Sequence, residues 1–219
     1  MTDLVQLIAQ LAQLAAGPLL IGLVGTSLVM VLIRNWRITL PALILQYALV
    51  GVMLARVTQP AVALITPLAG VLISLSLSIA AQRADNERAA RGESIAIERV
   101  KHVAWQSVPA QVLLRAVAAT LTLTAAFGVA VNFPLPGSAR ELGLAAYVLL
   151  ACGALIIAIA SEALNGGIGL LMIISGIELG YTPLEPSLSV VILLGLMNLL
   201  VGVAIAYLTL ADANSPKPA

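Results

Sequence analysis

The sequence consists of long apolar runs separated by short polar turns. An α-helix rises 1.5 Å per residue, so about 20 apolar residues cross the roughly 30 Å hydrocarbon core of a bilayer. Lipid does not tolerate an open sheet edge, so runs of this length are helices. The pattern predicts an all-α polytopic membrane bundle of about seven transmembrane helices. The predicted spans are residues 4–33, 38–55, 60–81, 113–131, 142–161, 165–181 and 187–210.

One extended polar segment, residues 82–111, interrupts this pattern. Ile97, Val100 and Ala104 recur there at helical spacing, with charged side chains around the rest of the helix. This spacing predicts a cytoplasmic amphipathic helix on the membrane surface. Residues 1–210 are therefore expected to form a single transmembrane domain, and residues 211–219 a disordered tail. No signal peptide is expected, because no Lys or Arg precedes the first apolar run.

A polar stripe marks the beginning of the first run. Asp3, Gln6, Gln10 and Gln13 fall at i, i+3, i+7 and i+10, which places them on one helix face. The stripe either lies in water along an interfacial extension of the helix or docks against a partner subunit. The sequence leaves both interpretations open.

The basic residues predict the orientation of the chain. With seven spans and the N-terminus outside, the outer segments hold only Arg56 and Arg140. The other basic residues fall on the inner side: Arg34, Arg37, Arg83, Arg88, Arg91, Arg99, Lys101, Arg115 and Lys217. Cytoplasmic segments of membrane proteins carry an excess of Lys and Arg. The chain is therefore predicted to be N-out and C-in.

Composition excludes several classes of function. The chain is 61% hydrophobic and only 10% charged, whereas a soluble domain carries about 25% charged residues. The net charge of +1 says nothing about nucleic acid, but the sequence has no basic cluster with interleaved aromatics, so no nucleic-acid partner is expected. A single cysteine, Cys152, and a single histidine, His102, leave no metal-ligand set. We expect no cofactor and no catalytic site within the chain itself.

Glu178 is a carboxylate among Ile, Leu and Gly in the sixth predicted span. An ionisable group at membrane depth costs roughly 2.5–3.5 kcal/mol on insertion scales, so it is a functional-site candidate. If the helix enters near Asn165, Glu178 lies about 20 Å along it, in the outer third. Two interpretations are open: a carboxylate near the outer interface, hydrated or bonded near Tyr181, or a buried carboxylate that handles protons.

Small residues accompany Glu178 in the last two spans. Gly176 and Gly180 lie one turn apart, and Gly195, Asn198 and Gly202 share a face of the seventh span. In lipid, helices associate through close packing of small residues and through polar side chains. The pattern predicts that the last helices approach closely, with Asn198 hydrogen-bonding to a neighbour.

The same reasoning ranks two glycines. Gly70, in the third span, has no small partner four positions away apart from Ser74. Leucine at Gly176 is therefore expected to cost more stability than leucine at Gly70.

The last three spans, with the motif GIEL around Glu178, resemble the small three-helix membrane subunit of respiratory complex I. The whole chain resembles an enlarged relative, the hydrogenase-4 component E family, in length, in layout and in the segments NWRITLPALILQ and LITPLAGVLISL. The resemblance implies a subunit of a respiratory or hydrogenase-type complex in a bacterial inner membrane. It also implies that residues 142–210 form a part like the small complex I subunit, and that membrane lipids and other membrane subunits are the partners.

The chain also departs from these families. In the complex I subunit, carboxylates on the second and third helices form part of a buried proton-relay axis. Glu178 can stand for the first of these, but Asn198 occupies the region of the second. Where component E proteins often carry a lysine in the third span, this chain has Pro67. The resemblance therefore implies a scaffold or a degenerate part of a proton-translocating membrane arm, with Glu178 and Asn198 as the proton-relay candidates.

Two other classes remain open. A standalone transporter of ions or small molecules usually shows internal repeats around a midplane site, and the sequence contains no convincing repeat. A structural or assembly subunit of an unrelated membrane complex would also fit the composition.

Overall fold

The structure, a computed structural model, describes residues 16–33, 35–90, 108–136, 139–185 and 187–214. Within these ranges the chain is helical and contains no strand. The helices are α2 (Ala16–Leu32), α3 (Trp36–Leu54), α4 (Pro60–Ala63), α5 (Ile65–Ala90), α7 (Val108–Asn132), α8 (Arg140–Ile159), α9 (Ala163–Tyr181) and α10 (Leu188–Asn214).

Six of these helices are long and apolar enough to cross a membrane: α3, α5, α7, α8, α9 and α10. The described part of α2 adds a shorter apolar helix of 17 residues. The prediction of an all-α helical membrane bundle is confirmed by these elements.

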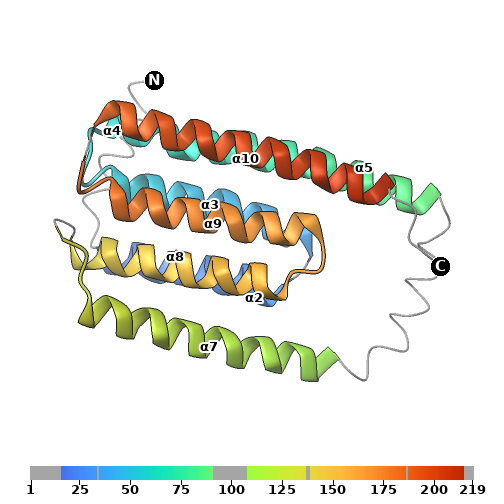
Figure 1. The fold of residues 1–219 in the computed structure, drawn as a ribbon, viewed down its shortest axis with the longest axis horizontal. Coiled ribbons are helices and arrows are strands. Elements are labelled where there is room, and N and C mark those ends of the chain that lie inside the picture. The colour runs from blue at the N-terminus through green and yellow to red at the C-terminus, as the bar shows by residue number, and fades with distance from the viewer. Residues whose placement is uncertain (1–15, 34, 91–107, 137–138, 186, 215–219) are drawn as a thin grey trace.

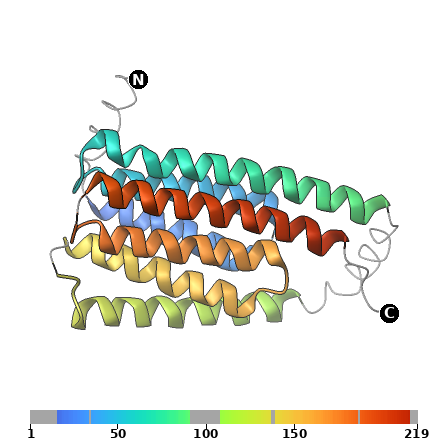
Figure 2. The same cartoon turned by 45° about the horizontal axis from the view of Figure 1, so that its top comes forward.

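The helices form two layers that lie face to face (Figure 1). We call α2, α3 and α5 the first layer, and α8, α9 and α10 the second layer. Within each layer the middle helix packs against both of its neighbours. Across the layers, α2 faces α8, α3 faces α9 and α5 faces α10 (Figures 1 and 2).

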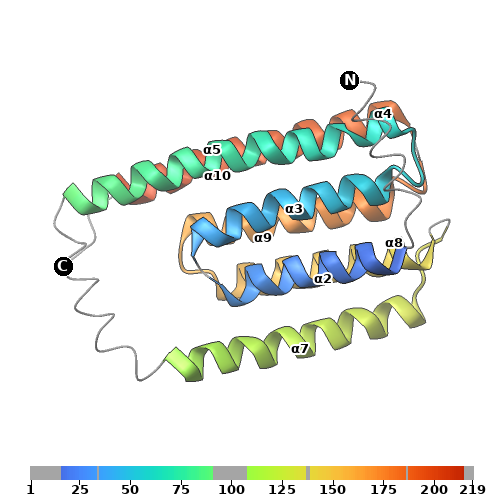
Figure 3. The same cartoon turned by 180° about the vertical axis from the view of Figure 1, so that it is seen from behind.

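The two layers run in the same directions as well as in the same order. Seen from behind, the first layer covers the second, with α5 over α10 and α3 over α9 (Figure 3). In each layer the outer two helices run one way and the middle helix runs back. Helix α7 packs on α8 and α2 at one edge of the bundle. In the sequence, α7 lies between the last helix of the first layer and the first helix of the second. The second layer is therefore a shifted copy of the first in architecture, although the sequence shows no repeat.

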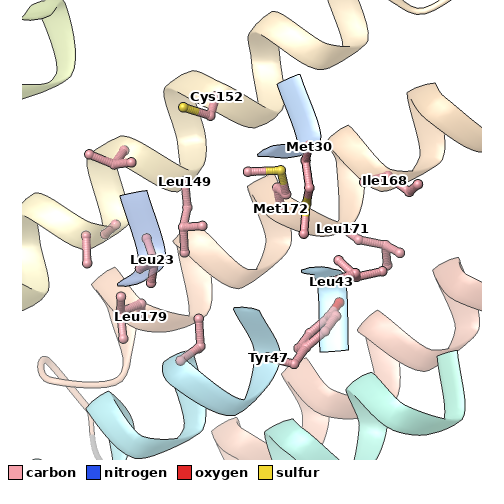
Figure 4. Packing of buried hydrophobic residues seen from close by; sticks show 14 of the residues in the cluster. Leu23, Met30, Leu43, Tyr47, Leu149, Cys152, Ile168, Leu171, Met172 and Leu179 are labelled. Atoms are coloured by element: carbon pink, nitrogen blue, oxygen red, sulfur yellow. The ribbon is translucent and has the colours of Figure 1, made fainter. Parts of the chain in front are cut away.

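Large apolar side chains fill the space within and between the layers (Figure 4). Leu43 on α3 and Leu171 and Met172 on α9 are fully buried, as are Leu23 on α2 and Leu149 on α8. Apolar residues on the outer surfaces of the bundle remain exposed, as expected for helices that contact lipid.

Glycines bring α8 and α9 into close contact. A Cβ on Gly153 would lie 2.6 Å from the carbonyl oxygen of Gly169, and a Cβ on Gly169 would lie 2.7 Å from that of Gly153. Only glycine allows two backbones to approach this closely.

The described basic residues lie toward the two ends of the bundle. Arg37 is the second residue of α3, Arg88 lies near the end of α5 and Arg115 near the start of α7, and these helix ends share one end of the bundle. Arg56 and Arg140 lie at helix ends on the opposite side. Which end faces the cytoplasm stays a prediction.

Two polar contacts join helices at the end that carries Arg37 and Arg88. The Trp36 indole donates to Asp85 Oδ2 on α5 at 2.9 Å, and Arg88 lies 3.7 Å from Asp212 on α10. The first contact fixes the start of α3 to α5. The second joins the ends of α5 and α10.

Several predicted boundaries were wrong. The third span, predicted as residues 60–81, is divided into α4 and α5, and α5 continues to Ala90 through the first part of the polar segment. Helix α10 runs to Asn214, into the predicted disordered tail. The N-terminal polar stripe, Arg34, residues 91–107 with the amphipathic face and His102, and residues 215–219 with Lys217 lie outside the described residues.

Candidate functional site

Glu178 lies between the two layers, three residues before the end of α9. Its side chain is 0% exposed, and its Oε1 accepts a hydrogen bond of 2.6 Å from the hydroxyl of Thr66, the second residue of α5. Thr182, one turn further on, donates to the backbone carbonyl of Glu178 at 2.6 Å. The carboxylate is thus held by a hydroxyl from the opposite layer.

This placement decides between the two interpretations of where the carboxylate lies. The carboxylate is not exposed at an interface, and the Tyr181 hydroxyl donates instead to Glu185 Oε2 at 3.1 Å. The interpretation of Glu178 as an exposed carboxylate at the outer interface is therefore wrong. Glu178 is near the end of its helix, as expected, but the facing layer covers it.

The second carboxylate oxygen of Glu178 has no hydrogen-bond partner, and Glu178 forms no salt bridge with any residue that the structure describes. A buried carboxylate is costly in its charged form unless a cation, a donor or water compensates it. One oxygen of Glu178 thus remains open to a proton or to a water molecule.

A second polar pair joins the layers nearer the middle of the bundle. The hydroxyl of Tyr47 on α3 donates to Asn198 Oδ1 on α10 at 2.9 Å, and both residues are 1% exposed. Ser175, one turn before Glu178 on α9, is also buried and lies near the Tyr47 hydroxyl. Asn198 therefore hydrogen-bonds across helices, and its partner comes from the first layer rather than from α9.

Gly70 makes room for Tyr47. A Cβ at Gly70 would collide with Cβ, Cγ and Cδ2 of the tyrosine, so the ring lies directly against the backbone of α5. A Cβ at Gly176 would meet Ala146 O of α8 at 3.0 Å, which is a milder contact. These contacts favour the reverse of the expected ranking, because Gly70 faces a large aromatic ring rather than a small partner.

The remaining glycines of the predicted set face different helices. Gly180 meets Leu135 and Ala146 at ordinary contact distance, whereas the last two meet α5: Gly195 faces Ile65 and Gly202 faces Ile73. The last helices are thus not packed by a single glycine interface.

Two further buried polar side chains lie on the helices of the first layer. Gln46, beside Tyr47 on α3, and Ser74, one turn beyond Gly70 on α5, are each 1% exposed. Neither the Gln46 amide nor the Ser74 hydroxyl has a partner among the described residues. Ser76 and Ser78, on the same helix, donate to backbone carbonyls of α5 itself.

Sequence reasoning missed Thr66 and Tyr47. Each is one hydroxyl in a long apolar run, and periodicity does not reveal which hydroxyl meets a carboxylate on a helix more than 100 residues away. The adjacent Gln46 and Tyr47, two side chains with polar atoms in the middle of the second span, were the available signal.

The described residues contain no group of three or more His, Cys, Asp or Glu side chains that could hold a metal ion. The polar core instead offers hydroxyls, two amides and one carboxylate, which can pass or hold a proton through hydrogen bonds. No known protein family, curated protein or solved structure matches this chain.

Proposed function

We propose that this chain is a membrane subunit of a respiratory or hydrogenase-type complex, in which Glu178 is a proton site in a degenerate part of the membrane arm. The observation that supports the proposal is the buried carboxylate of Glu178, bound on one oxygen by Thr66 and open on the other. Ionisable side chains inside membrane domains mark proton and ion paths. The bacterial inner membrane is the location that this function implies.

The relay is degenerate because Glu178 is the one buried acid among the residues that the structure describes. A proton moves between groups that are within hydrogen-bond reach, and Asn198 on α10, which bonds to Tyr47, does not titrate. Thr66 donates its hydroxyl to the acid, whereas Tyr47 donates to Asn198 and Ser175 donates to the carbonyl of Leu171. Glu178 can therefore bind a proton, and the chain also has a structural role in the membrane arm.

Substitution of Glu178 tests the proton site. In membrane vesicles that contain the whole complex, Glu178→Gln is expected to leave assembly intact and to lower proton translocation about two- to fivefold, well below the roughly 10²–10⁴-fold of an essential acid or base. Glu141→Gln, at the exposed start of α8, is the control and should have no effect. Complete loss of translocation would show an essential relay, and an unchanged rate would show a scaffold without a proton site.

A standalone transporter is the second candidate, and the repeated layers favour it. Transporter folds are commonly built from repeats, with the substrate site at the repeat interface. Here that interface is closed by fully buried side chains such as Leu43, Leu171 and Met172. Affinity purification of the tagged chain in mild detergent separates the candidates: co-purifying redox or antiporter-like subunits support the complex, whereas transport by the purified chain alone in vesicles supports the transporter.

A further inference from the structure

Glu178 lies close to one end of the bundle and far from the other. It is three residues before Tyr181, the last residue of α9, which is about 5 Å at 1.5 Å per residue. The part of α9 that precedes it, residues 163–177, extends about 22 Å in the other direction. Its partner Thr66 is the second residue of α5, so the facing helix begins beside the acid. We call the end of the bundle where α9 ends and α5 begins the near end, and the opposite end the far end (Figure 1).

Polar groups lie along the short stretch between Glu178 and the near end. Thr182, directly after α9, is 0% exposed, and its hydroxyl donates to the carbonyl of Glu178. In the facing layer, the helix is interrupted at Leu64, between α4 and α5. Pro67 has no N–H group to donate to the carbonyl of Ala63, four residues earlier, which explains the interruption. A hydroxyl and a carbonyl without its helical donor therefore lie toward the near end, where water can bond to them.

The route along α9 toward the far end is apolar. One turn before Glu178, the Ser175 hydroxyl donates to the carbonyl of Leu171, and the neighbouring Tyr47 hydroxyl donates to Asn198. From position 166 to position 174, α9 contains only Gly, Ile, Leu and Met. Of these, Ile168, Leu171 and Met172 are at most 1% exposed and pack together with Leu43 (Figure 4). Water on this route would lose hydrogen bonds that the side chains of α9 do not replace.

The first layer closes the same route. Gln46, beside Tyr47 on α3, is followed toward the far end by Leu43 and Leu40, which are 0% and 4% exposed. Ser74 on α5 is followed in that direction by Leu77, which is 0% exposed. These two buried polar side chains are thus separated from the far end by close-packed apolar ones.

From this asymmetry we infer that water and protons reach Glu178 from the near end only. The side chain is 0% exposed, so access requires a local opening. Helix termini open at a lower free-energy cost than the packed middle of a helix, and α9 ends and α5 begins beside the acid. The inference rests on the proposed function, in which Glu178 binds a proton, and it adds the membrane surface with which that proton exchanges. In the predicted orientation this is the outer surface.

Thiol labelling from each membrane surface tests the inference. In a chain with Cys152→Ala, one cysteine replaces either Glu178 or, as a matched control, Leu171. Leu171 lies seven residues earlier on the same face of α9 and is equally buried. An impermeant methanethiosulfonate is added to sealed vesicles of either orientation that contain the whole complex. Leu184→Cys and Asn86→Cys, exposed at the near and far ends, identify the two surfaces.

The expected result is modification of Glu178→Cys at least about tenfold faster from the near-end surface than from the other surface. Leu171→Cys should be unreactive from both surfaces. Faster reaction of Glu178→Cys from the far-end surface, equal rates from both surfaces or no reaction from either would overturn the inference. So would a Leu171→Cys that reacts as fast as Glu178→Cys. Thermal melting of each purified variant shows that it is folded.

A second measurement uses the native carboxylate and needs no substitution. A water-soluble carbodiimide with an amine nucleophile is added from one surface, and peptide mass spectrometry reports which acids are modified. Glu141 at the near end and Glu162 at the far end are both exposed and verify the sidedness. Glu178 is expected to be modified together with Glu141 and not with Glu162, and the opposite pairing would overturn the inference.

The inference and the proposed function can fail separately. If Glu178 reacts from the near-end surface but Glu178→Gln leaves proton translocation unchanged, the access route stands and the proposed function is wrong. If Glu178→Gln lowers translocation but Glu178 reacts from the far-end surface, the proposed function stands and the access route is wrong.

Discussion

The two layers share helix order and direction, yet they supply opposite halves of the polar contacts between them. The first layer donates: Thr66 and Tyr47 contribute hydroxyl groups. The second layer accepts: Glu178 and Asn198 contribute carbonyl or carboxylate oxygens. Counted from the start of each helix, the position of α3 that corresponds to Glu178 is Gly51, which packs against Pro67. A repeated architecture thus holds a single polar core, and the chemistry of the two layers is complementary rather than duplicated.

The largest effect expected concerns the shared direction of the layers. Single cysteines at Arg56 after α3 and at Leu184 after α9, in a chain with Cys152→Ala, should both react with an impermeant thiol reagent from the outside. A cysteine at Asn86, in the exposed end of α5, should react only after the membrane is permeabilised. Labelling of 56 and 184 from opposite sides would mean that the layers do not run in parallel.

The next test breaks the contact between α3 and α5 that orients Tyr47. Gly70→Ala is expected to lower the free energy of unfolding by about 2–3 kcal/mol, because the added Cβ forces the tyrosine ring away. Gly176→Ala should cost about 1 kcal/mol. Gly25→Ala, which meets nothing within 4 Å, should be neutral or stabilising by roughly 0.5–1 kcal/mol. Thermal melting in detergent provides the comparison, and equal melting temperatures for Gly70→Ala and Gly25→Ala would contradict it.

A smaller effect isolates one donor and acceptor pair. Tyr47→Phe leaves Asn198 buried without its partner and should cost about 1–3 kcal/mol. The control is Tyr147→Phe, since the Tyr147 hydroxyl donates to the carbonyl of Phe133 in an exposed setting, and it should cost less than about 1 kcal/mol. Replacing Asn198 by Leu together with Tyr47→Phe should recover part of the loss. Additive losses in this double-mutant cycle would show that the two side chains do not interact.

The sequence predicted the helices well and the contacts between helices poorly. Apolar length places a span whatever its neighbours are, so α3, α7, α8 and α9 lie within a few residues of their predicted positions. The break at Leu64 was missed. The extension of α5 to Ala90 was also missed, because a helix continues through polar residues where a neighbouring helix such as α10 packs against it.

The candidate site was predicted only in part. Glu178 and Asn198 stood out as polar side chains in apolar spans, and both prove to be buried. Thr66 and Tyr47 did not stand out, because their importance comes from which helix each faces. The role of Gly70 depends in the same way on the ring of Tyr47, which lies 23 positions earlier in the chain. Such pairings follow from the stacking of the layers, and the chain contains no sequence repeat that would indicate it.

Helix α7 determines the direction in which the second layer runs through the bundle. A unit of three antiparallel helices finishes at the end of the bundle opposite to its start, so a second unit attached directly to the first would be inverted. One additional crossing, α7, returns the chain to the starting side, and α8 therefore enters the bundle as α2 does. Without α7, the end of α9 and the start of α5 would lie at opposite ends of the bundle. Glu178 and Thr66 can meet only because the number of crossings between them is even.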